Sequence, residues 1–121
     1  MRQILIIDDD LQIRTLLKKI FEKEGFQVIE AQDGNEGIRQ FREKGADLVI
    51  TDLVMPEKEG IETIIELKRE FPDVKIIAIS GGGLNLPDAY LDVARFLGAI
   101  HTFSKPFVPA ELLDVVNQVL P

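Results

Sequence analysis

Short runs of apolar and mostly β-branched residues recur five times along the chain. They span residues 3–7, 26–31, 47–51, 74–79 and 100–104. Runs of this length and composition are typical of strands covered on both faces of a sheet. The pattern therefore predicts five β-strands.

Helical patterns occupy the intervals between these runs and follow the last of them. From Leu11 to Glu24, apolar residues recur every three or four positions, the spacing that gives a helix one buried side. Asp10 is the expected N-cap of this helix, and Gly25 ends it. The other predicted helices span residues 33–45, 59–71, 87–97 and 108–120. The second opens with Asp33 and Glu36 in the spacing of a capping box.

This alternation of strand and helix, repeated five times, predicts a (βα)5 fold. Right-handed βαβ crossovers lead to a parallel sheet with helices on both faces. The predicted class is therefore α/β: a doubly wound, five-stranded parallel sheet in three α/β/α layers. A chain of 121 residues is long enough for one such core. We expect a single domain over residues 1–121, without an output domain.

Acidic side chains stand where two of the predicted strands end. Asp8 and Asp9 follow the first run, and Asp52 follows the third. Neighbouring parallel strands open onto one crevice at their carboxyl ends, so these carboxylates can converge. Two such anions about 4 Å apart repel by roughly 4 kcal/mol at an effective dielectric constant of about 20. Either the carboxylates take up protons, or a hard divalent cation lies among their oxygens; we favour the cation.

Four strand-end signatures occur together and in order. They are Asp8-Asp9, then Asp52 followed by Met55-Pro56 and Gly60, then Ser80, and finally Lys105-Pro106-Phe107. Each is weak alone, but the combination, over essentially the whole chain, resembles the receiver domain of two-component response regulators. The resemblance implies a flavodoxin-like receiver fold.

The same resemblance implies a role for each acidic residue. Asp52 would be the phosphoacceptor, taking a phosphoryl group from a sensor histidine kinase, a phosphotransfer protein or a small donor such as acetyl phosphate. Asp9 and Asp52 would bind Mg²⁺ directly with the backbone carbonyl of Val54, and Asp8 would act through a water molecule. Magnesium prefers oxygen ligands and keeps several waters, which suits this sparse set.

Two more side chains complete the implied reaction site. Lys105 would place a positive charge beside the acceptor carboxylate, and Ser80 would donate its hydroxyl to a phosphoryl oxygen. The resemblance also implies a cis peptide bond between Lys105 and Pro106. One departure from the family pattern is Thr102, which stands where relatives usually carry Tyr or Phe.

The predicted fourth helix, fifth strand and fifth helix share apolar residues that the inward patterns leave unassigned. These are Tyr90, Phe96, Ile100 and Val115. In receivers this face commonly mediates output or dimerisation, so we expect it to bind a downstream protein or a second copy of the chain. The alternative is an ordinary scatter of apolar residues over the surface.

Composition excludes several other classes of protein. The net charge of −7 argues against direct DNA binding and against anionic membranes. The chain has no cysteine and one histidine, His101, so thiolate and multi-histidine metal sites are excluded. The N-terminal apolar run is too short for a signal peptide or a spanning helix, which predicts a cytoplasmic protein.

Three other functions fit the same architecture less well. Haloacid-dehalogenase-like phosphatases carry Asp-x-Asp after the first strand and a cap, for which this chain has no room. A nucleotide or flavin binder needs a glycine-rich phosphate loop there, and Asp8-Asp9-Asp10 is electrostatically its opposite. A phosphorylation-independent pseudo-receiver or docking scaffold is the remaining alternative, although every reactive position is filled. We expect a protein that accepts its own phosphoryl group and is not a turnover enzyme.

Overall fold

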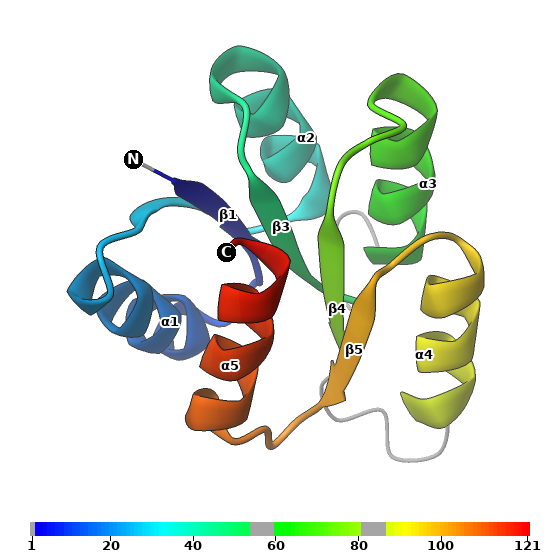
Figure 1. Ribbon diagram of the computed structural model, residues 1–121. Helices are drawn as coiled ribbons and strands as arrows, with labels where there is room; N and C mark the ends of the chain where they lie inside the picture. The colour runs from blue at the N-terminus through cyan, green and yellow to red at the C-terminus, as the bar shows by residue number, and fades with distance from the viewer. Residues whose placement is uncertain (1, 54–59, 81–86) are drawn as a thin grey trace.

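The alternation of strands and helices is the dominant feature of the fold (Figure 1). The computed structural model describes residues 2–53, 60–80 and 87–121, with backbone alone for residues 87–91. The elements are β1 (Gln3–Ile7), α1 (Leu11–Lys23), β2 (Gln27–Ala31), α2 (Gly34–Lys44), β3 (Leu48–Asp52), α3 (Gly60–Glu70), β4 (Ile76–Ser80), α4 (Pro87–Phe96), β5 (His101–Ser104) and α5 (Pro109–Val119). Each element begins and ends within about two residues of its predicted boundaries.

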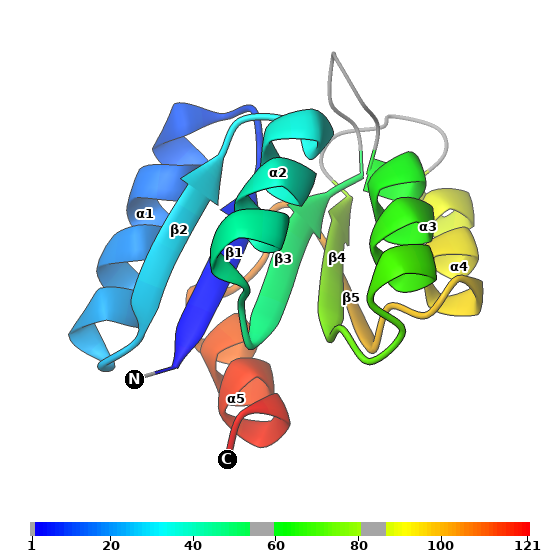
Figure 2. The same cartoon turned by 90° about the horizontal axis from the view of Figure 1, so that it is seen from above.

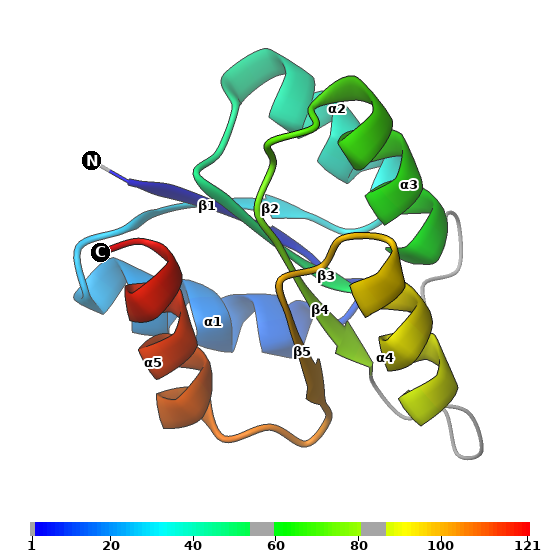
Figure 3. The ribbon, with the colours of Figure 1, turned by 45° about the vertical axis from the view of Figure 1, so that its right-hand side comes forward.

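The five strands form one parallel sheet in the order β2-β1-β3-β4-β5. Helices α1 and α5 cover one face, and α2, α3 and α4 cover the other (Figures 2 and 3). This is the flavodoxin-like receiver fold, which confirms the predicted class. The strand order reverses between β1 and β3, and such a switch point opens a crevice at the carboxyl ends of the two strands.

Alternate residues along β1 point to opposite faces of the sheet and pack in two separate hydrophobic cores. Ile4 and Ile6 pack with α1 and α5, whereas Leu5 and Ile7 pack with α2 and α3. All four are essentially inaccessible to solvent. Burial of an aliphatic side chain of this size stabilises the fold by about 1.5–3 kcal/mol. Both faces of β1 are therefore anchored, which holds its carboxyl end in place.

Two predicted N-caps are present. The Asp10 side chain accepts a 2.8 Å hydrogen bond from the amide of Gln12 at the start of α1. The Asp33 side chain accepts a 2.8 Å hydrogen bond from the amide of Glu36 at the start of α2. Each satisfies a backbone donor that the first turn of a helix leaves open. Gly25, after α1, has φ +92°, a conformation that favours glycine.

The prediction for the outer side of α5 was partly wrong. Val115 is half-buried and packs against the core, because α5 lies against both the sheet and α1 and so needs a wider apolar side. Phe96 is 90% exposed, and Ile100 and Val93 are exposed as well. The side chain of Tyr90 lies outside the described residues.

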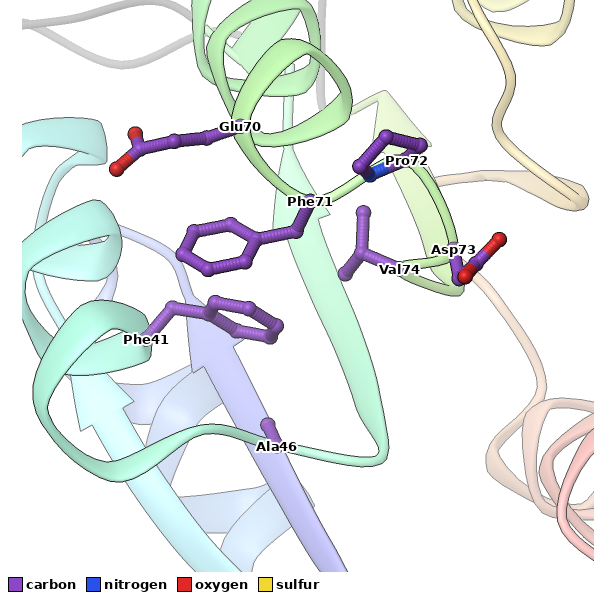
Figure 4. A pocket seen from close by; sticks show the side chains of 7 residues that line it. All are labelled: Phe41, Ala46, Glu70, Phe71, Pro72, Asp73 and Val74. Atoms are coloured by element: carbon purple, nitrogen blue, oxygen red, sulfur yellow. The ribbon is translucent and has the colours of Figure 1, made fainter.

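A hollow of about 380 Å³ lies between the end of α2 and the connection from α3 to β4 (Figure 4). The rings of Phe41 and Phe71 meet edge to face in it, with centroids 4.7 Å apart. It opens near the amino ends of β3 and β4, opposite the carboxylates at the strand carboxyl ends. The hollow is therefore separate from the predicted site.

Within the described ranges, no helix has the length and apolar character needed to cross a membrane.

Candidate functional site

The three predicted carboxylates come together at the carboxyl ends of β1 and β3. One oxygen each of Asp8, Asp9 and Asp52 lies within 4.8 Å of the others. We call these residues the acidic cluster. Asp8 and Asp52 are 2% and 4% exposed, whereas Asp9 is open to solvent. The convergence predicted from parallel-sheet topology is confirmed.

Lys105 places a positive charge against two carboxylates of this cluster. Its Nζ lies 3.0 Å from Oδ2 of Asp8 and 3.3 Å from Oδ2 of Asp52. Burial by itself lowers the pKa of Lys105, but the hydrogen bond from its ammonium to Asp8 and the charges of Asp52 and Asp8 outweigh burial. The pKa is therefore raised above the ordinary 10.5, so Lys105 is charged at neutral pH.

The backbone around Lys105 holds the ammonium in place. Its amide donates a 2.8 Å hydrogen bond to the carbonyl oxygen of Ser80, which ties the segment after β5 to the end of β4. The peptide bond between Lys105 and Pro106 is cis, as predicted. Lys105 thus joins three strand ends: its ammonium contacts Asp8, which follows β1, and Asp52, which ends β3, and its amide is hydrogen-bonded to the end of β4.

Gly60 explains how α3 returns so closely to the end of β3. Its amide donates a 3.0 Å hydrogen bond to the carbonyl oxygen of Leu53. A Cβ atom at this position would overlap the carbonyl oxygen of Asp52 and lie 2.6 Å from Cα of Leu53. Any side chain here would push against the backbone that carries Asp52, so glycine is required.

Ser80 is the only buried side chain with an unsatisfied polar atom among the described residues. It ends β4, is 1% exposed, and its hydroxyl has no hydrogen-bond partner in the part of the chain that the structure describes. Buried hydroxyls are nearly always hydrogen-bonded, because an unmade bond costs about 1–3 kcal/mol. Ser80 ends the strand beside the one that carries Asp52, and an unpaired donor there suits a ligand oxygen.

We expect the Ser80→Ala variant to be at least as stable as the wild type, because alanine removes an unsatisfied hydroxyl. Thr51→Val is the matched control, since the Thr51 hydroxyl is also buried but donates a 3.0 Å hydrogen bond to the carbonyl oxygen of Asp52. That variant should lose about 1 kcal/mol. Urea unfolding measures both values. An equal loss in the two variants would show that Ser80 has a structural hydrogen bond after all.

Thr102 accepts hydrogen bonds from α4 at the position where the family usually carries an aromatic residue. Its Oγ1 accepts from Nε and Nη2 of Arg95 at 3.1 and 2.9 Å. Arg95 also lies 3.7 Å from Asp92, one turn earlier in α4. A polar contact therefore joins α4 to β5 here.

The donor set of the acidic cluster fits Mg²⁺. Two oxygens bound directly to this ion lie at most about 4.2 Å apart, twice its usual bond length, and the ion keeps several waters. A spread of up to 4.8 Å agrees with binding that is partly direct and partly through water. The expected carbonyl ligand, that of Val54, lies outside the described residues.

Among the described residues, sequence reasoning missed Arg14, which touches the acidic cluster. Nη1 of Arg14 donates a 2.6 Å hydrogen bond to the backbone carbonyl of Asp8. Nothing in the sequence pattern distinguishes Arg14 from an ordinary polar residue on α1, since the contact depends on where the chain turns after β1.

Comparisons with known proteins agree with this geometry. Residues 4–117 match the family described as "Response regulator receiver domain". The chain is 35% identical to the chemotaxis protein CheY of Thermotoga maritima, over 98% of this chain and 97% of the relative. It is 33% identical to sporulation initiation phosphotransferase F of Bacillus subtilis, over 98% of this chain and 94% of the relative.

Solved structures give the same result. A response regulator receiver domain protein from Clostridium thermocellum superposes with a TM-score of 0.88 at 31% identity, covering 98% of this chain and 94% of that one. The response regulator TrrA of Thermotoga maritima, solved in complex with Mg(2+)-BeF, superposes with a TM-score of 0.86 at 31% identity, covering 98% and 99%.

The fold, the acidic cluster and these matches define a signalling module of the two-component type. The chain belongs to the response regulator receiver domain family and is CheY-like. Receivers of this family are not turnover enzymes on a separate substrate, so that expectation is confirmed.

Proposed function

We propose that this chain is a single-domain response regulator of a two-component phosphorelay that accepts a phosphoryl group on Asp52 in a Mg²⁺-dependent reaction. The observation that carries the proposal is the position of the Asp52 carboxylate, which is buried and lies with Asp8 and Asp9 in one cluster. A sensor histidine kinase, a phosphotransfer protein or a small phosphodonor supplies the group. The protein acts in the cytoplasm, and phosphorylation changes its binding to a partner.

In the proposed reaction an oxygen of Asp52 attacks the phosphorus atom of the donor. A carboxylate–phosphorus bond forms while the bond from phosphorus to the donor breaks, and the donor leaves with that electron pair. Lys105 lies 3.3 Å from Oδ2 of Asp52, where its charge stabilises the negative oxygens of the group in transfer. The hydroxyl of Ser80 donates to one of those oxygens.

Asp8 and Asp9 supply the remaining carboxylates for the cation. Asp9 and Asp52 would bind the cation directly, and Asp8 would act through a water molecule, since its own Oδ2 accepts a hydrogen bond from Lys105. When bound, Mg²⁺ neutralises negative charge on the transferring phosphoryl group. The acidic cluster thereby lets an anionic carboxylate and an anionic donor meet.

Phosphorylation then changes which partner binds. The exposed apolar residues Val93, Phe96 and Ile100 gather around the end of α4 and the start of β5. We assign this face to a downstream protein or to a second copy of the chain. It is joined to β5 through the contact between Arg95 and Thr102.

The proposal is tested by incubating the protein with acetyl phosphate and Mg²⁺ and measuring its intact mass. We expect the mass of one phosphoryl group to be added, and chelation of Mg²⁺ to prevent the addition. A protein that takes up no group from acetyl phosphate or a kinase, yet still binds a partner, would be a docking scaffold, and the proposal would be wrong.

A further inference from the structure

Arg14, one turn into α1, reaches back to the start of the acidic cluster. Its Nη1 lies 2.6 Å from the carbonyl oxygen of Asp8, and its Nε lies 3.3 Å from Oε1 of Glu30 on β2. The Arg14 side chain is only 14% exposed. A planar guanidinium held at two points has a defined orientation, so its hydrogen bond to the carbonyl is directional.

The carbonyl that Arg14 binds belongs to the peptide joining Asp8 to Asp9. Because a peptide unit is planar, fixing this oxygen also fixes the direction in which the chain leaves Asp8. The other groups of Asp8 are already held: its amide donates to Ala31 at 3.1 Å, and its Oδ1 accepts from the amide of Asp10 at 2.9 Å. The orientation of the peptide is what remains for Arg14 to set.

Asp9 depends on this peptide more than Asp8 does. Its side chain is exposed, and no hydrogen bond to another described residue holds it. The backbone before it is therefore the main constraint on where its carboxylate lies.

Glu30 provides the second anchor and balances the charge of Arg14. It lies on β2, which forms one edge of the sheet, and its other oxygen is 3.7 Å from Nζ of Lys18. A carboxylate beside the guanidinium reduces the repulsion between Arg14 and a cation in the acidic cluster. The contacts form a chain from the sheet edge to the Asp8–Asp9 peptide.

We propose that Arg14 is a positioning residue, which holds the Asp8–Asp9 peptide so that both carboxylates face one divalent cation. This inference rests on the proposed function, because it takes Asp8 and Asp9 to be cation ligands. In this role Arg14 does not touch the cation and acts only through the backbone of Asp8 and Asp9.

The two possible roles of Arg14, an effect of its charge alone and positioning of the peptide, predict opposite changes in cation affinity for Arg14→Ala. An arginine that acted only through its charge would repel the cation, so its removal would tighten cation binding. A positioning residue predicts the reverse: we expect binding to weaken about tenfold or more, the range found for residues that orient metal ligands. Arg14→Lys, which keeps one donor and the charge, should recover part of the affinity, and Glu30→Gln should weaken binding less than Arg14→Ala.

The measurement is an electron paramagnetic resonance titration of Mn²⁺, with Mg²⁺ as competitor, on the unphosphorylated full chain. Arg42→Ala is the matched control, because Arg42 pairs with Glu66 at 3.3 Å and Glu70 at 2.7 Å on the surface, at the far end of α2 from the acidic cluster. It should leave Mn²⁺ affinity unchanged. Circular dichroism without metal checks that each variant is folded, and if Arg14→Ala fails this check, Arg14→Lys and Glu30→Gln carry the test.

Two results would overturn the role of Arg14 alone: Arg14→Ala binding Mn²⁺ as tightly as the wild type or more tightly, or Arg42→Ala weakening it equally. In both, the wild type still binds the ion and takes up a phosphoryl group. A wild type that binds no Mn²⁺ would overturn the proposed function, and the role of Arg14 with it.

Discussion

The Asp52→Asn variant should take up no phosphoryl group from acetyl phosphate in the presence of Mg²⁺. An amide oxygen is a far weaker nucleophile than a carboxylate, so the asparagine should not attack the phosphorus atom of the donor. Intact mass measures the adduct in both proteins. In the wild type, hydroxylamine should remove it, because the product is an acyl phosphate.

Substitution of two other aspartates distinguishes the nucleophile from a cation ligand and from an unrelated surface carboxylate. Asp9→Asn should slow the reaction without abolishing it, since it weakens cation binding and leaves the Asp52 carboxylate intact. Asp73→Asn should change nothing, because Asp73 is exposed near the amino end of β4. A full adduct on Asp52→Asn would place the acceptor elsewhere and overturn the assignment.

The Lys105→Met variant should unfold more readily without divalent cations and recover much of that loss when Mg²⁺ is added. In the wild type, the ammonium of Lys105 lies between the carboxylates of Asp8 and Asp52, at 3.0 and 3.3 Å. Loss of these contacts should cost about 2 kcal/mol, in the range for hydrogen bonds between charged groups. A cation that binds the native state alone offsets such a loss, and it binds better once the competing ammonium is gone. Urea unfolding in chelator and in Mg²⁺ measures both effects.

Lys68→Met is the matched control for this prediction. The ammonium of Lys68 donates a 2.7 Å hydrogen bond to the carbonyl oxygen of Val74, away from the acidic cluster. Its loss of stability should therefore be the same with and without Mg²⁺. If Lys105→Met also lost the same amount under both conditions, Lys105 would not share its carboxylates with a cation.

The rate of phosphoryl transfer should fall in Lys105→Met even where Mg²⁺ restores stability. Loss of one positioned donor from a developing oxyanion typically costs about 10² to 10³ in rate. The same variant thus distinguishes the effect of Lys105 on stability from its effect on the rate of transfer. The cation replaces the ammonium as a partner for the carboxylates, but it does not replace the ammonium as a donor to the phosphoryl oxygens.

Much of the site could be predicted because it follows from local patterns and one topological rule. Apolar runs and helical spacing are properties of neighbouring residues, and they set the strands, the helices and the caps at Asp10 and Asp33. In a parallel sheet, strand ends meet at one edge, which brings Asp8 and Asp52 together. Resemblance to the family supplied the roles of Ser80 and Lys105, and the predicted cis bond before Pro106 is present.

The sequence by itself therefore determined the order of the elements, the class of fold and the aspartates of the acidic cluster. Only the tertiary structure decided that the ammonium of Lys105 lies between two carboxylates, that the Ser80 hydroxyl is buried without a partner among the described residues, that Arg14 holds the Asp8 carbonyl, and that Val115 packs inward. Most of these features depend on distances between groups from elements that are not adjacent along the chain, and the contact of Arg14 depends on how the chain turns between β1 and α1. Such distances are set by how helices pack on the sheet, and no spacing along the sequence encodes them.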